Sequence, residues 1–184
     1  MAEIRLLLVT GSTRRLSTNS AALHTAQALL NGDATTVYDG LPDLPAFNPD
    51  DDHEAVPPAV RALRALITDA DAVILCTPEY AGTLPGSLKN LLDWTVGGGE
   101  IYGKPVAWIN VAPPGRGGGA DASLRVVLGY VGARILETSG IRVPVPHDSV
   151  GPDGVIVHPA TRASLAEALE KIVAELEPLA SEQG

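Results

Sequence analysis

The stretch that decides the fold lies near the start of the chain and reads Gly11-Ser12-Thr13-Arg14-Arg15-Leu16-Ser17-Thr18-Asn19-Ser20. An apolar run, Ile4–Val9, precedes it, and a helical pattern, Ala21–Leu30, follows it. A buried strand, a polar loop and a helix in this order place unpaired backbone N–H groups and the positive end of the helix dipole in the loop. The stretch therefore predicts a cradle for an anion such as phosphate at the helix N-terminus.

The side chains of this loop suit the same ligand. Arg14 can pair with an anion through its charge. Hydroxyl or amide groups that can donate to phosphate oxygens are present in Ser12, Ser17, Thr18, Asn19 and Ser20. Asn19 or Ser20 is equally suited to cap the helix. The loop lacks the Gly-Lys-Ser/Thr ending of a nucleotide P-loop and the G-x-G-x-x-G spacing of a dinucleotide fold, so we expect a mononucleotide such as FMN.

Composition narrows the class of protein. The chain has 184 residues, of which 45% are hydrophobic, which predicts one globular domain over residues 1–184. The formal net charge of −9 argues against a nucleic-acid partner, which would select a basic surface. The single cysteine, Cys76, excludes an internal disulfide framework. No apolar run approaches the ~18 residues of a membrane span and no secretory signal is recognised, so we expect a cytoplasmic protein without a membrane partner.

Strand and helix patterns alternate along the chain. The expected strands are Ile4–Thr10, Ala34–Tyr38, Ala72–Thr77, Lys104–Val111 and Ile141–Val145. The expected helices are Ser20–Leu30, Ala59–Asp69, Gly86–Thr95, Ala120–Thr138 and Thr161–Leu179. A further short extended piece is expected at Val155–Val157. This alternation predicts an α/β fold with a doubly wound parallel sheet of five strands in the order 2-1-3-4-5 and helices on both faces.

A long segment, Asp39–Pro58, interrupts the alternation with several prolines, which is typical of a functional or interfacial loop. Its run Asp50–Glu54 has the residue types of a metal site, but a solvated charge run is the commoner meaning, so no metal is expected.

The loop after the third expected strand, Pro78–Pro85, is the second candidate site. Its prolines and glycines fix a tight turn whose backbone amides can face a ligand, and the ring of Tyr80 can stack on one. Backbone N–H groups of this kind can orient a flavin ring and stabilise its reduced, anionic form. An ordinary loop before a well-formed helix is the alternative interpretation.

Taken together, these motifs resemble the NADPH-dependent FMN reductase family, which includes flavin, quinone and chromate reductases and azoreductase-like enzymes on a flavodoxin-like fold. The resemblance extends from about Ile4 to Ile141. It rests on the pattern Gly11-Ser12-x-Arg14-x-x-Ser17-x-Asn19, on Pro78-Glu79-Tyr80, and on Gly82-x-x-Pro85-Gly86-x-Leu88-Lys89-Asn90-x-x-Asp93-Trp94.

The resemblance implies roles for particular residues. It implies that the FMN phosphate is held by Ser12, Arg14, Ser17, Asn19 and Ser20. It implies that the isoalloxazine ring and ribityl chain are lined by Pro78, Glu79, Tyr80, Ala81 and Gly82. A glycine-rich loop after the fourth strand would flank the flavin through Gly115, Gly117 and Gly118. Many family members have Asn at the position of Ala81, so a polar side chain near the ring is missing here. Arg116 is a candidate for the 2′-phosphate of NADPH, or an ordinary surface arginine.

The implied reaction is hydride transfer from NAD(P)H to FMN and onward to a quinone, a flavin or a similar small acceptor. No catalytic side chain is assigned, because the flavin carries the chemistry. The alternative is a non-catalytic FMN protein that transfers electrons or senses redox state. A phosphatase is set aside, since Cys76 is not followed by the arginine that such a site needs.

Family members form homodimers or homotetramers, so the resemblance implies an assembly of this kind. The subunit edge is expected at Asp39–Pro58 and Trp94–Tyr102, and Trp94 itself is interpreted as a core residue.

Overall fold

The computed structural model describes residues 4–14, 16–30, 34–53 and 56–181. The strands form one parallel sheet in the order β2-β1-β3-β4-β5, and β6 also pairs with β4. Their bounds are β1 Leu6–Thr10, β2 Thr35–Tyr38, β3 Ala72–Cys76, β4 Pro105–Asn110, β5 Arg134–Ile135 and β6 Ile141–Arg142. The predicted fold class and strand order are confirmed.

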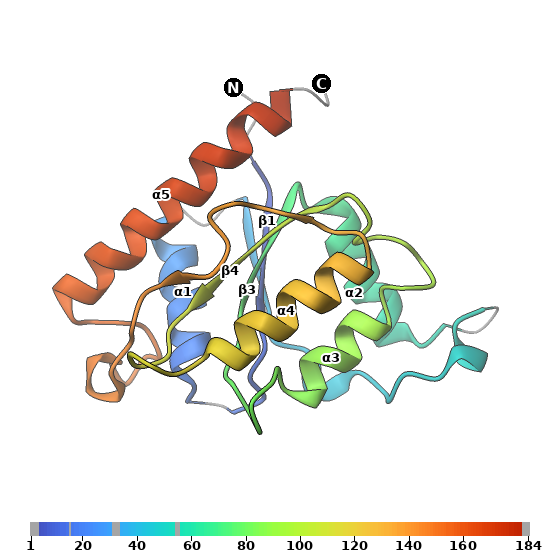
Figure 1. The fold of residues 1–184 in the computed structure, drawn as a ribbon, viewed down its shortest axis with the longest axis horizontal. Helices are drawn as coiled ribbons and strands as arrows, with labels where there is room; N and C mark the ends of the chain where they lie inside the picture. The colour runs from blue at the N-terminus through green and yellow to red at the C-terminus, as the bar shows by residue number, and fades with distance from the viewer. Residues whose placement is uncertain (1–3, 15, 31–33, 54–55, 182–184) are drawn as a thin grey trace.

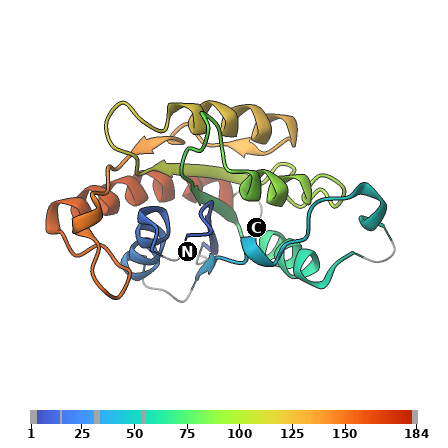
Figure 2. The same cartoon turned by 90° about the horizontal axis from the view of Figure 1, so that it is seen from below.

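Helices cover both faces of the sheet (Figures 1 and 2). Their bounds are α1 Thr18–Leu29, α2 Pro58–Asp69, α3 Gly86–Asp93, α4 Gly118–Tyr130 and α5 Pro159–Ser181, with short 3-10 turns η1 Leu41–Asp43, η2 Pro49–Asp51 and η3 His147–Ser149. Helices α1 and α5 pack on one face, and α2, α3 and α4 pack on the other. None of the helices in these described ranges is long and apolar enough to cross a membrane.

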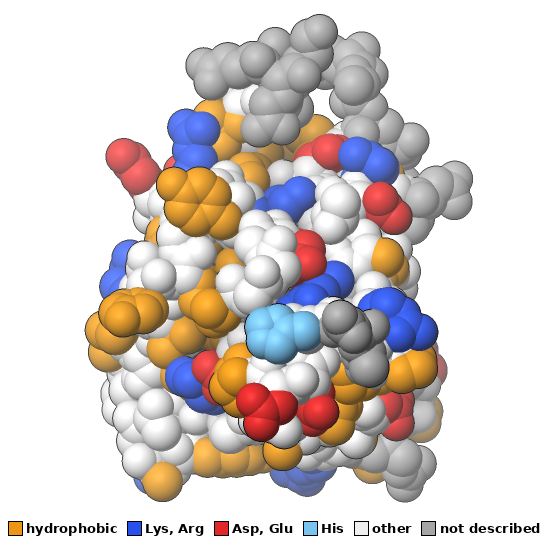
Figure 3. All heavy atoms as spheres, turned by 90° about the vertical axis from the view of Figure 1, so that its right-hand side faces the viewer, with side chains coloured by type: hydrophobic (Ala, Val, Ile, Leu, Met, Phe, Trp, Pro, Cys, Tyr) orange, Lys and Arg blue, Asp and Glu red, His pale blue; other side chains and the backbone are white. Residues whose placement is uncertain are grey.

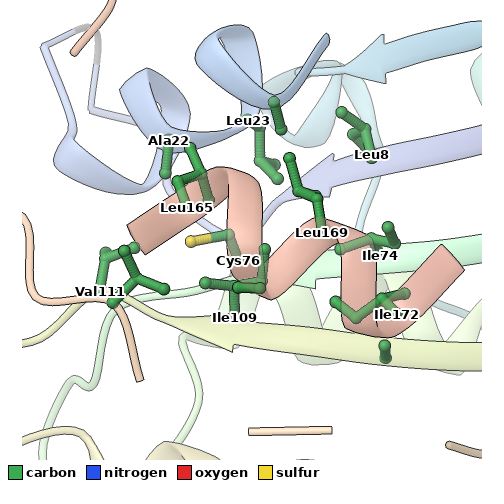
Figure 4. Close-up of a cluster of buried hydrophobic side chains, with 14 of the residues drawn as sticks. Leu8, Ala22, Leu23, Ile74, Cys76, Ile109, Val111, Leu165, Leu169 and Ile172 are labelled. Carbon is green, nitrogen blue, oxygen red and sulfur yellow. The ribbon is translucent and has the colours of Figure 1, made fainter. Parts of the chain in front are cut away.

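The central strands are apolar throughout because each contributes to two cores. In β1, Leu6 and Leu8 join the core under α1 and α5, whereas Leu7 and Val9 join the core under α2, α3 and α4. This is the period of two that a pleated strand imposes. Figure 4 shows the first core, where Leu8 and side chains of β3 and β4 face α1 and α5. The two cores hold the sheet rigid beneath its connecting loops.

The fourth helix and the fifth strand differ from the prediction. The expected helix Ala120–Thr138 ends at Tyr130, and the turn that follows contains Gly132 at a φ of +72°. The chain then pairs with β4 twice, at β5 and again at β6, so the predicted fifth strand Ile141–Val145 has regular pairing only over its first two residues. The backbone N–H groups of Val143 and Val145 nevertheless still donate to β4 and the residue after it, Val111.

The insertion Glu137–Gly140 separates β5 from β6 and is closed by one carboxylate. Glu175 of α5 accepts hydrogen bonds from the backbone N–H of Glu137 (2.7 Å), from the backbone N–H of Thr138 (3.0 Å) and from the Thr138 hydroxyl (2.7 Å). Burial raises the pKa of Glu175, but these hydrogen bonds outweigh it and the net pKa lies below its ordinary value. The insertion therefore depends on an ionised Glu175.

The long segment after β2 packs against α3. The indole N–H of Trp94 donates to the Pro45 carbonyl (2.9 Å), the Phe47 N–H donates to Asn90 Oδ1 (2.7 Å), and the Phe47 and Trp94 rings meet edge to face. Trp94 is fully buried, which confirms that it is a core residue.

The acidic run Asp50–Glu54 is partly committed to an ion pair. Asp52 lies 2.5 Å from Arg64, and both side chains are mostly buried. Glu54 lies outside the described residues. Figure 3 views the end of the molecule at the right of Figure 1 and shows acidic, basic and hydrophobic side chains interspersed there. The short extended piece expected at Val155–Val157 is present only as a bridge between Val150 and Ile156.

Candidate functional site

The loops after β1, β3 and β4 meet at the carboxyl edge of the sheet, at the lower end of Figure 1. Close approach of the first two loops requires a glycine. The Gly11 N–H donates to the Cys76 carbonyl (2.8 Å), and a Cβ at Gly11 would lie 2.2 Å from Thr77 Oγ1. The residue that begins the polar stretch therefore sets the contact between the first two candidate loops.

Two serines give the first loop its shape. Ser17 is the N-cap of α1, where its hydroxyl accepts from the Asn19 N–H (3.2 Å). The Ser12 hydroxyl accepts from the Arg14 N–H (3.2 Å), and Ser12 and Ser17 are both buried. The Ser20 hydroxyl pairs with Thr10 (3.0 Å). The loop is thus held by its own hydroxyls, and it presents Arg14 exposed at the surface.

Asn19 is tied into the protein more closely than the sequence indicated. Its side chain is buried, its Nδ2 donates to Ser17 Oγ (3.4 Å), and its Oδ1 accepts from the Cys76 thiol (3.4 Å). Burial raises the pKa of Cys76, which keeps the thiol protonated and consistent with a core role. Asn19 therefore links α1 to β3, and its contact with a phosphate stays a prediction.

The second loop closes as a tight hairpin. Tyr80 and Thr83 exchange two backbone hydrogen bonds (2.9 and 3.1 Å), and between them Ala81 and Gly82 have φ of +49° and +78°. Positive φ at both central residues is the pattern of a type I′ turn, which favours Asn and Gly. Ala81 is the one described non-glycine residue with positive φ, so it occupies a conformation that Asn tolerates better. Tyr80 is 53% exposed at the edge of this turn.

Glu79 joins the second loop to the third. Its Oε2 accepts from the backbone N–H of Gly119 (2.7 Å) and of Ala120 (3.3 Å), at the N-terminus of α4. A Cβ at Gly119 would lie 2.1 Å from the Gly82 carbonyl oxygen, so the approach is as close as glycine allows. Sequence reasoning placed Glu79 along the flavin, whereas the structure gives its carboxylate a helix N-terminus as partner.

The third loop is shaped by Asn110 and Asp121, which were not predicted from the sequence, together with Gly117, which was. Asn110, at the end of β4, accepts from the Ala112 N–H (3.0 Å) and donates to Asp121 of α4 (2.8 Å). Gly117 is the N-cap of α4 and has a φ of +82°, and a Cβ there would lie 2.6 Å from Asn110 Nδ2. An Asn at the end of a strand, followed by a glycine-rich loop and an Asp in the next helix, is the signal that could have found this network.

The site residues assigned from the sequence thus share one edge of the sheet, and the groups left facing outward fit FMN. A Cβ added at Gly82, Gly115 or Gly118 would meet no atom within 4 Å, so a ligand can approach the backbone at each. The exposed Tyr80 ring offers an aromatic surface, and exposed Arg14 offers a cation for phosphate. A cavity of about 180 Å³ adjoins the first loop and is lined by Leu16, Ser17, Ser20, Ala21, His24, Val150, Pro152, Asp153 and Gly154.

A parallel sheet of this order, with helices on both faces, defines a flavodoxin-like α/β protein. The sequence profile described as NADPH-dependent FMN reductase matches residues 4–144, and the chain belongs to this family. The family uses FMN and NAD(P)H. The chain is an oxidoreductase of the NAD(P)H-dependent FMN and quinone reductase type.

Curated proteins and solved structures agree with this assignment. The chain is 30% identical to a 2-hydroxy-1,4-benzoquinone reductase of Burkholderia sp, over 93% of this chain and 95% of the relative. It is 30% identical to an NAD(P)H-dependent FMN reductase of Pseudomonas aeruginosa, over 92% and 94%. The structure is similar to FerB, a flavoenzyme NAD(P)H:(acceptor) oxidoreductase from Paracoccus denitrificans, with a TM-score of 0.80, 28% identity and coverage of 95% and 98%.

Proposed function

We propose that the chain binds FMN across the carboxyl edge of its sheet and uses NAD(P)H to reduce quinones or similar small acceptors. In this proposal the phosphate lies against the first loop at Ser12, Arg14, Ser17, Asn19 and Ser20. The ring lies along the second and third loops, at Pro78, Glu79, Tyr80, Ala81, Gly82, Gly115, Gly117 and Gly118. The whole chain, residues 1–184, serves as one FMN-binding domain.

The observation that carries the proposal is the contrast between fixed loops and open positions at this edge. Glu79 and the close approach of Gly119 to Gly82 fix the second loop against α4. The Tyr80 side chain is about half exposed, and a Cβ at Gly82 would meet no atom within 4 Å. A largely preformed site whose backbone a ligand can approach closely is typical of small-molecule and cofactor sites.

FMN, when bound, would supply the centre that accepts and returns a hydride. The chain's own work is binding and orientation. Arg14 and the N-terminus of α1 would hold the phosphate charge. The backbone N–H groups of the turn at Ala81 and Gly82 would be positioned to stabilise negative charge on a reduced ring. No described side chain is required as a general acid or base for hydride transfer.

The acceptor is inferred from the open ring edge and from the relatives. Only Tyr80 among the described aromatic residues lies at this turn, so one face of a planar ligand would stay open to a second planar molecule. Relatives from Burkholderia sp and Escherichia coli are named 2-hydroxy-1,4-benzoquinone reductase and quinone reductase. We therefore propose a quinone as acceptor and Arg116, in the third loop, as the contact for the 2′-phosphate of NADPH.

Assembly and location complete the proposal. We propose a homodimer or homotetramer in the cytoplasm, with Asp39–Pro58 and Trp94–Tyr102 at the subunit edge. Val96 and Tyr102 in the second of these segments are exposed by 60% and 78%, which supports a contact there.

The test is turnover by flavin-loaded protein. We expect NADPH or NADH oxidation that depends on added 1,4-benzoquinone and on FMN, with two electrons delivered per donor. Arg116→Ala should raise KM for NADPH and leave KM for NADH unchanged. Retention of FMN without quinone-dependent turnover would favour the alternative, a non-catalytic electron carrier or redox sensor.

A further inference from the structure

Arg14 has an imidazole where surface arginines commonly have a carboxylate. Its Nη1 lies 3.5 Å from Nε2 of His147. Among the ion pairs formed by the described residues, none involves Arg14. By contrast, Arg5 lies 3.0 Å from Asp71. A neutral imidazole nitrogen accepts an N–H hydrogen bond without cancelling the guanidinium charge, whereas a carboxylate cancels it.

His147 lies beside Arg14 because the segment that contains His147 is anchored to α1, the helix that follows the first loop. Ser149, two residues on, is buried, its hydroxyl donates to the Pro146 carbonyl, and its own carbonyl accepts from the Val157 N–H (2.8 Å). The neighbouring Ile156 is fully buried and donates its N–H to Thr25 Oγ1 on α1 (2.8 Å). The loop that positions His147 is therefore fixed to α1.

We propose that His147 is a positioning residue for phosphate recognition by Arg14. It holds the guanidinium beside the first loop and leaves its positive charge available for the phosphate of a mononucleotide. The inference rests on the proposed function, since it assigns His147 to the same FMN site. It adds a residue on the connection after β6, a segment outside the three loops to which the sequence analysis assigned binding residues.

The arrangement predicts an effect on the phosphate and none on the ring. FMN and riboflavin share the isoalloxazine ring and ribityl chain and differ in the terminal phosphate. A residue that acts through Arg14 must therefore contribute to the preference for FMN over riboflavin. A residue that only supports the fold would alter both affinities together.

The experiment is fluorescence titration of each flavin with apo protein, wild type and variants. His147→Ala should weaken FMN binding by about 3- to 10-fold, the size expected for one solvent-accessible hydrogen bond to a charged group, and leave riboflavin binding unchanged. His147→Gln, whose side-chain oxygen can accept from Arg14, should recover most of the loss. The control His53→Ala removes an exposed histidine in the segment after η2 and should change neither affinity.

A double-mutant cycle tests the route of the effect. In an Arg14→Ala background, His147→Ala should cause no further loss of FMN affinity. A further loss would overturn the proposal, because His147 would then contact the phosphate itself. An unchanged FMN preference in His147→Ala would also overturn it while leaving the FMN site intact. No preference for FMN in the wild type is a separate result, which would remove the phosphate site and this inference together.

Discussion

Two irregular segments of the chain, the first loop (residues 11–17) and the insertion Glu137–Gly140, both carry several polar groups. They differ in what those polar groups bind. In the insertion, Glu175 accepts from two backbone N–H groups and a hydroxyl, so the chain supplies its own anion. In the first loop, the serine hydroxyls accept internal hydrogen bonds, while Arg14 faces an imidazole and solvent. The donors of the insertion are used by the fold, whereas Arg14 has no carboxylate partner among the described residues, as we propose for a residue that binds a ligand.

The largest effect that this comparison predicts is on FMN affinity in Arg14→Ala. Removal of a charge-assisted contact to phosphate should weaken binding by about 10- to 100-fold, with riboflavin binding and thermal stability unchanged. Arg5→Ala is the matched control, because Arg5 is paired with Asp71 at the start of β1, and it should bind FMN as the wild type does. Full flavin retention in purified Arg14→Ala would contradict the role given to the first loop.

A smaller effect is expected where the second loop meets α4. Glu79→Ala leaves the N–H groups of Gly119 and Ala120 without their acceptor, so we expect a loss of about 1–2 kcal/mol in the free energy of unfolding. FMN and riboflavin should weaken by equal factors, since this contact supports the ring site and not the phosphate. Glu79→Gln keeps an acceptor oxygen and should lose less. Urea unfolding and paired flavin titrations measure both, and a phosphate-selective loss would contradict this division.

The insertion should respond to pH and not to flavin. Because the folded-state pKa of Glu175 lies below its ordinary value, its stabilisation is present above that value, about 4.3, and is lost as pH falls through the folded-state pKa. Glu175→Gln should therefore lose about 1 kcal/mol at pH 7, a figure reduced for solvent screening, and should approach the wild type in stability once the pH falls below the folded-state pKa of Glu175. FMN affinity should not change. A pH-independent difference in urea unfolding would show that ionisation is irrelevant.

The smallest effect is a gain at the turn of the second loop. Ala81 pays the penalty of positive φ, so Ala81→Gly should stabilise the protein by about 0.5 kcal/mol after the greater chain entropy of glycine is subtracted. Ala81→Asn should stabilise similarly, because Asn tolerates this conformation. Thermal unfolding measures the change. As a control, Val126→Gly should destabilise the protein, because Val126 is an exposed residue within α4. A lower melting temperature in both Ala81 variants would refute the strain at this position.

Most of the fold could be predicted because the strands are buried on both faces. A continuous apolar run such as Leu6–Val9, followed by a polar loop and a helix, is typical of a buried strand in a parallel sheet. The fifth strand was harder to predict, since β5 has only two residues and the apolar helical pattern of α4 continues towards it. The insertion is stabilised by Glu175, which lies 38 residues after Glu137. A contact over this sequence distance cannot be predicted from a local pattern.

The candidate site divides in the same way. Loop positions followed from spacing, because parallel strands bring their carboxyl ends together. Three contacts at the candidate site are tertiary: Glu79 with the N-terminus of α4, Asn110 with Asp121, and His147 with Arg14. Each joins two different elements, and the distance between those elements cannot be predicted from local sequence patterns. The sequence therefore predicts which loops lie at the candidate site, and the structure shows which of their side chains already contact other parts of the protein.

The proposed function depends on recognition of the flavin phosphate by the first loop. The most direct measurement is titration of FMN and of riboflavin with apo protein, followed by flavin fluorescence. We expect saturable quenching at micromolar protein, with FMN bound at least about 10-fold more tightly than riboflavin. Equal affinities, or no saturable quenching by either flavin, would contradict it.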